Sequence, residues 1–164
     1  MREDERTPAT FLRKLALTQD KQKRLKVLKA YSRMDTRLAE KILVEALGDP
    51  CEDIRDFIIR ELAGRDALDL DLLCARLVGP PWFARSAALR IIGIRKAEKA
   101  VQHIERILGD ANADVRKCAA DALGEIGGRD VLPLLVRLKK DENPYVRHAA
   151  EEGLRKASEV RFSL

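Results

Sequence analysis

Aromatic residues, long apolar runs and cysteine motifs are scarce in this chain. Only 4% of its 164 residues are Phe, Trp or Tyr, so we expect a core of Ala, Leu, Ile and Val. No apolar run approaches the roughly 20 residues of a membrane-spanning helix. The first residues, MREDERTPATF, lack the apolar stretch of a signal peptide. Cys51, Cys74 and Cys118 have no CxxC spacing, which favours reduced core residues of a cytoplasmic protein.

Signatures of catalysis are also missing. The sequence contains no HExxH, GxSxG or phosphate-binding loop motif. His103 and His148 are far apart in the repeat register and have no obvious third ligand. The sequence therefore predicts a protein that is not an enzyme and that holds no metal or cofactor.

Helix signals are frequent, and no run alternates apolar and polar residues as a strand would. Pro133 falls in the first turn of an expected helix. Glycines follow several expected helices: Gly48, Gly79, Gly109 and Gly128. The candidate N-caps are Thr7, Asp35, Asp49 and Asp130.

A repeat underlies this pattern. One arginine recurs about every 30 residues and has apolar neighbours at positions −1, +3 and +7 counted from it. Two helices in each unit of this length predict an all-α fold, an α-solenoid of about five repeats. The row arginines are Arg24, Arg55, Arg85, Arg116 and Arg147. The expected units of the single domain 1–164 are 8–33, 34–65, 66–95, 96–128 and 129–158. The expected helices are 8–17 and 20–32, 35–48 and 51–64, 67–78 and 82–94, 96–109 and 112–126, 130–140 and 143–157.

The units resemble HEAT repeats, especially the short repeats first grouped with phycobilisome lyase subunits. The segments 108–127 and 138–157 carry the resemblance. The segment 47–64 is a fair match, 77–94 is a looser one, and the unit around Arg24 matches mainly in spacing. The resemblance implies a binding scaffold rather than one particular activity.

The glycines near residue 124 have an architectural explanation. A phosphate-binding loop opens a helix after a strand, whereas this segment closes a helix. We expect Ala122 to let neighbouring helices approach closely, and Gly124, Gly127 and Gly128 to end the helix.

The row arginines have two interpretations. Asp49, Asp110 and Asp141 each precede a row arginine by six residues. The HEAT resemblance implies that such turn aspartates bond to arginines along the stack; a ladder that grips phosphate or carboxylate ligands is the alternative. Gly79 and Thr18 replace the aspartate in two units, so we expect interruptions there.

Charge is concentrated at the N-terminal end. Residues 11–37 hold nine Lys or Arg and two Asp, a net charge of +7 against +5 for the whole chain. This unit is either a solvated end cap or a site for nucleic acid, an anionic membrane or an acidic partner. At the other end, Glu151 occupies an otherwise apolar position, so we expect no further repeat to cover it, and a loosely held tail from 158 onwards.

The HEAT resemblance implies that the second helix of each pair lines a concave face. We expect positions +1 and +5 to point outward there, with charge running from basic to acidic along the stack. A duplex-binding groove would be basic throughout, so the mixture favours a protein or peptide partner. The +1 row is Leu25, Asp56, Ser86, Lys117 and His148, and the +5 row is Lys29, Arg60, Arg90, Asp121 and Glu152. The predicted partner-binding residues are Arg60, Arg90, Trp82, Phe83, Asp56, Lys117 and Asp121.

The turn GPPWF departs most from the repeat. Trp82 and Phe83 either plug the turn locally or anchor a partner. The sequence thus predicts a non-catalytic scaffold that binds a protein on its concave face. The alternatives are an accessory subunit of a lyase-type or cofactor-attaching enzyme, and a nucleic-acid binder that uses the basic first unit.

Overall fold

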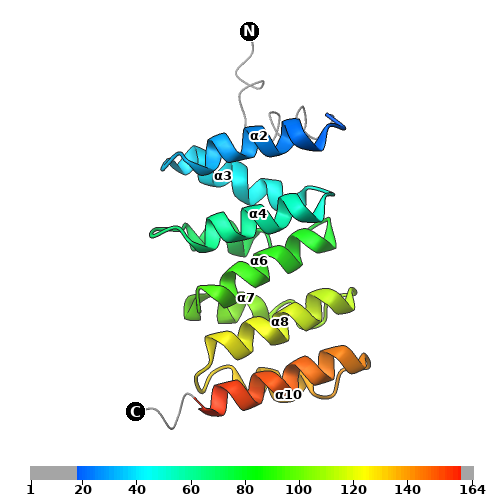
Figure 1. The fold of residues 1–164 in the computed structure, drawn as a ribbon. Coiled ribbons are helices and arrows are strands. Elements are labelled where there is room, and N and C mark those ends of the chain that lie inside the picture. Colours follow the sequence, from blue (N-terminus) through cyan, green and yellow to red (C-terminus); the bar gives the residue numbers. More distant parts are fainter. Residues whose placement is uncertain (1–17, 160–164) are drawn as a thin grey trace.

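The computed structural model of the chain describes residues 18–159, and this part is a stack of helix pairs. Figure 1 shows the second helices of the pairs following one another along one side, with the first helices behind them. The all-α solenoid is therefore confirmed, while the expected helix 8–17, Thr7 and the tail from 160 onwards lie outside the described residues. The second helices are α2 (Lys21–Ser32), α4 (Glu52–Ala63), α6 (Trp82–Ile94), α8 (Ala113–Ile126) and α10 (Pro144–Glu159). The first helices are α3 (Arg37–Glu45) with the 3-10 turn η2 (Ala46–Gly48), α5 (Leu70–Ala75), the 3-10 turn η3 (Glu98–Ala100) with α7 (Val101–Glu105), and α9 (Leu132–Leu138).

Three predicted N-caps are wrong. Helix α3 is capped by Thr36, whose hydroxyl accepts from the backbone N–H of Ala39. Helices α4 and α9 begin after Cys51 and Val131, whose side chains make no capping bond. Pro133 does lie in the first turn of α9, as expected. The mispredicted residues are Asp35, Asp49 and Asp130.

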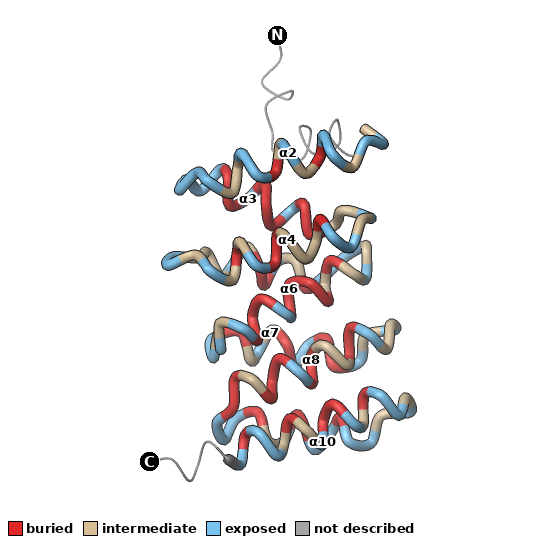
Figure 2. Tube along the Cα trace, in the orientation of Figure 1, coloured by how far each residue is buried: buried red, intermediate tan, exposed pale blue. Residues whose placement is uncertain are grey.

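The core follows the predicted rows. Positions −1, +3 and +7 are buried in the second helices of the inner repeats, and Val115 and Leu123 of α8 are 0% exposed. Figure 2 shows the buried residues along the contacts between successive helices. In α2, Val27 and Tyr31, at positions +3 and +7, are only half-buried.

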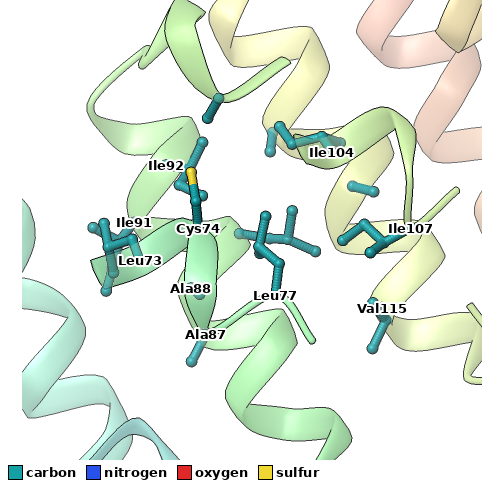
Figure 3. Packing of buried hydrophobic residues seen from close by; sticks show 14 of the residues in the cluster. Leu73, Cys74, Leu77, Ala87, Ala88, Ile91, Ile92, Ile104, Ile107 and Val115 are labelled. Atoms are coloured by element: carbon teal, nitrogen blue, oxygen red, sulfur yellow. The ribbon is translucent and has the colours of Figure 1, made fainter. Parts of the chain in front are cut away.

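The cysteines divide into two groups. Cys74 is buried among the apolar side chains between α5, α6 and the next repeat (Figure 3). Cys51 and Cys118 are half-buried and pack against the core from its edge. No disulfide joins these three cysteines, and the expected reduced state stays a prediction.

Backbones approach closely in the C-terminal half of the stack. A Cβ atom built on Gly93 would lie 3.0 Å from the Cα atom of Ala122, as expected for this small residue. A Cβ atom on Gly124 would lie 2.6 Å from the Cα atom of Gly153. The prediction that Gly124 ends its helix is wrong, because it lies inside α8 at this contact with α10. The chain turns at residues 127–128, which both have positive φ, 69° and 87°.

Candidate protein-interaction face

The row arginines and turn aspartates form a ladder along one edge of the stack. In three steps, Nε and Nη2 of the arginine donate to the two carboxylate oxygens of the next repeat's aspartate. Each of the five row arginines also donates from Nη1 to the carbonyl oxygen of the residue six positions before it. The ladder is therefore part of the packing between and within repeats, as the resemblance implied. The pairs are Arg24–Asp49, Arg85–Asp110 and Arg116–Asp141, with an Nε–O distance of 2.8 Å in each.

These bonds lower the pKa values of two ladder carboxyls. The guanidinium of Arg116 is the main reason that the pKa of Asp141 lies below its ordinary value. Burial alone would raise the pKa of Asp110, but the bonds from Arg85 and from the backbone N–H of Asn112 outweigh it. Both carboxylates are therefore held in the charged form.

The predicted interruption at Gly79 is confirmed. Arg55 has no carboxylate at this step; its guanidinium carbon lies 4.5 Å from the centroid of the Phe83 ring instead. The interruption predicted at Thr18 stays a prediction, because the described residues contain no repeat before it.

The second-helix face is the surface of α2, α4, α6, α8 and α10 away from the first helices. It brings together Asp56 of α4 and Arg90 of α6, whose carboxylate and guanidinium lie 2.8 Å apart across two repeats. Lys117 and Asp121 form a 2.8 Å ion pair within α8. Arg60 is exposed and has no carboxylate partner among residues 18–159. Four of the predicted residues are therefore joined in two ion pairs.

The charge gradient on this face is uneven. Asp121 is neutralised by Lys117, and Glu152 lies 2.9 Å from Arg155. Lys29, in contrast, lies over the ring of Phe57 rather than beside a carboxylate. Within the +1 and +5 rows, the charge that no described carboxylate neutralises is thus positive and lies on α2 and α4.

The outward direction predicted for the +1 row is wrong at Ser86. This residue is 8% exposed, because α6 and α8 approach closely along the line of Gly93 and Ala122. The preceding member of the row, Asp56, is half-buried and reaches the surface to meet Arg90. Exposure in this row therefore depends on how closely the next repeat approaches.

Trp82 and Phe83 have different surroundings. The two rings meet edge to face, with centroids 5.8 Å apart and an interplanar angle of 76°. Phe83 is half-buried against Arg55, whereas Trp82 remains 41% exposed beside the turn that holds the exposed Val78. Local packing thus accounts for Phe83, while Trp82 keeps a surface available for contact.

A family model described as HEAT repeats matches residues 70–155, which is more than half of the chain. The chain belongs to the HEAT-repeat family. No curated protein matches this HEAT protein. HEAT repeats commonly mediate protein–protein interactions and are typically non-catalytic scaffolds.

A second pair of arginines in this HEAT protein was not predicted. Arg65 donates to the carbonyl oxygen of Met34 at 3.0 Å, and Arg95 donates to that of Ala63 at 3.1 Å. Each arginine thereby places its positive charge at the C-terminal end of the preceding second helix. Both follow a row arginine by ten residues, a spacing that could have identified them.

Two negative findings concern the described part of the HEAT protein. Among residues 18–159, no helix has the length and apolar character needed to cross a membrane. The same residues hold no group of three or more His, Cys, Asp or Glu side chains arranged to hold a metal ion. His103 lies on α7 and His148 on α10.

Proposed function

We propose that this protein is a non-catalytic scaffold that binds a partner protein or peptide along its second-helix face. The supporting observation is the positive charge of Arg60 and Lys29, which no described carboxylate neutralises, on the same face as the ion-paired Asp121. Such a face favours a partner that places acidic groups over α2 and α4. A nucleic-acid duplex would instead require basic groups along the whole face.

The ion pair between Asp56 and Arg90 is one that an acidic group of a partner can displace. Both side chains remain partly exposed, at 36% and 50%, so the pair contributes about 0–1 kcal/mol to folding stability. An acidic group of a partner can therefore replace Asp56 beside Arg90 at little cost to the fold. Trp82 adds an exposed aromatic side chain of the kind that often dominates the binding energy of interfaces.

Affinity purification followed by mass spectrometry tests this proposal. The bait proteins are the natural chain, Arg60→Glu, and Arg137→Glu as a matched control. Arg137 is also exposed and without an ion-pair partner among the described residues, but it lies on the first helix α9. We expect partners retained by the natural chain and by Arg137→Glu to be lost with Arg60→Glu.

Equal recovery with all three baits would place the interface elsewhere and contradict the proposal. The likeness to the phycobilisome-lyase type of repeat stays a prediction. The same purification tests it, because an accessory subunit of such an enzyme would recover its enzyme partner.

A further inference from the structure

The repeats define which side of a second helix meets the preceding repeat. Position +6 from the row arginine contributes Ala122 in α8 and Gly153 in α10, which face Gly93 and Gly124 of the preceding second helices. Position +2 lies one turn away on the same side of the helix. Both positions are therefore buried or half-buried wherever a second helix precedes.

In α2 the same two positions are Lys26 and Ala30, and both are exposed. They belong to a shallow cavity of about 380 Å³ that runs along this side of the helix. Half-buried Leu25 supplies apolar surface within it. The cavity is lined by Gln22, Leu25, Lys26, Lys29, Ala30 and Arg33.

We propose that this cavity binds an acidic amphipathic helix of a partner protein, in the place where a preceding second helix would lie. Ala30 is as small as its counterpart Ala122, so a helix can approach α2 closely. Lys26 and Arg33 have no carboxylate partner among residues 18–159, and they flank Ala30 on the same side of α2. A helix with small or apolar residues along its contact line and Glu or Asp beside them complements this surface.

A second copy of this chain is a poorer occupant. The outer side of α10 would have to stack on α2, and Arg155 occupies the +8 position that Gly93 holds in α6 and Gly124 in α8. Stacking would bring Arg155 towards the basic cavity. The ladder would also lack its carboxylate, because Arg147 would meet Thr18 where three of the four inner steps have an aspartate.

The cavity shares Leu25 and Lys29 with the second-helix face. The inference does not rest on the proposed function, because its deciding residues, Lys26 and Ala30, lie on the side of α2 that a preceding second helix would cover. Fluorescence anisotropy with the full chain tests it. The probe is a labelled helical peptide of about 18 residues, with an Ala and Leu stripe flanked by Glu. A peptide with Lys in place of each Glu, and a labelled DNA duplex, serve as comparisons.

Two matched variants distinguish helix docking from general charge attraction. Ala30→Gln adds bulk to the cavity without changing its charge, and Ala75→Gln makes the same change at an exposed residue of α5. We expect Ala30→Gln to weaken binding of the acidic peptide about tenfold and Ala75→Gln to leave that affinity unchanged. Lys26→Gln should weaken the binding and also reduce its dependence on salt. The Lys-containing peptide should not bind.

Four results would overturn the inference. The first is equal affinity of the acidic peptide for Ala30→Gln and for the natural chain. The second is binding of the DNA duplex but not of the acidic peptide, and the third is binding of neither probe. The fourth is self-association of the natural chain that Ala30→Gln abolishes. The last result would identify a second copy as the occupant.

Discussion

The guanidinium carbon of Arg55 lies 4.5 Å from the centroid of the Phe83 ring, at the step of the stack where Gly79 replaces the turn aspartate. Arg55 still donates from Nη1 to the carbonyl oxygen of Asp49, so its side chain keeps the orientation of the other row arginines. Gly79 has a φ of 80°, which an aspartate would rarely adopt. The aromatic ring thus takes the place of the carboxylate in a turn whose backbone disfavours aspartate.

A double-mutant cycle measures this contact. We expect Phe83→Leu, which keeps much of the apolar volume, to lower the free energy of unfolding by about 0.5–2 kcal/mol because the ring face is lost. In an Arg55→Met background the same change should cost less, giving a coupling of about 0.5–1 kcal/mol in urea unfolding. A coupling of zero would show that Phe83 contributes only apolar burial.

The close approach of α8 and α10 predicts a strong effect of a single methyl group. In Gly124→Ala the new Cβ atom would lie 2.6 Å from the Cα atom of Gly153, so the helices must move apart. We expect a loss of about 1–3 kcal/mol in stability, measured by thermal or urea unfolding. Gly109→Ala is the control, because its Cβ atom would meet no atom within 4 Å. Similar stabilities for the two variants would contradict the close contact.

The lowered pKa of the ladder carboxyl Asp141 predicts that folding stability decreases at low pH. Because the pKa of Asp141 is lowered in the folded protein, its contribution to stability is complete above the unfolded pKa of about 3.9 and is lost as the pH falls towards the folded pKa. The melting temperature of the natural protein should therefore fall more steeply below about pH 4 than that of Asp141→Asn. Asp66→Asn, a change at an exposed aspartate, should leave the steep fall in place. Parallel curves for all three proteins would argue against this role of Asp141.

Exposure of Trp82 predicts a spectroscopic signature and a binding effect. It is the single tryptophan of the chain and is 41% exposed, so the emission of the free protein should be red-shifted and quenched by acrylamide. Trp82→Ala should cost about 2 kcal/mol in affinity for a partner recovered on the second-helix face, with little change in melting temperature.

Tyr145→Ala is the matched control, because this aromatic residue is 72% exposed at the start of α10. A blue-shifted, protected Trp82 whose removal lowers the melting temperature would identify it as a packing residue instead.

The sequence predicted what is repeated in every unit. The buried rows that contain Val115 and Leu123 follow from helical periodicity, and the pairing of Arg116 with Asp141 follows from the recurring turn residues. These features need no knowledge of how one repeat is rotated against the next. Family membership and the solenoid fold could therefore be expected from the sequence alone.

Features that depend on the contact between particular repeats were missed. The burial of Ser86 and the placement of Gly124 inside a contact both depend on how closely two second helices approach. Helix α5 was expected over 67–78 but spans Leu70–Ala75, because Asp69 caps it by accepting from the backbone N–H of Asp71. Local propensity does not determine which of several nearby polar residues becomes the cap.

The edge of the stack opposite the ladder is held in two different ways. Arg65 and Arg95 bridge α2 to α4 and α4 to α6 through hydrogen bonds to carbonyl oxygens, whereas α6, α8 and α10 meet through the backbone at Gly93 and Gly124. A side-chain hydrogen bond can lengthen or be exchanged for one to water, but a close backbone contact has no such substitute. We therefore expect the stack to be more flexible between α2 and α6 than between α6 and α10. A change in its curvature on binding a partner should occur mainly in the N-terminal half.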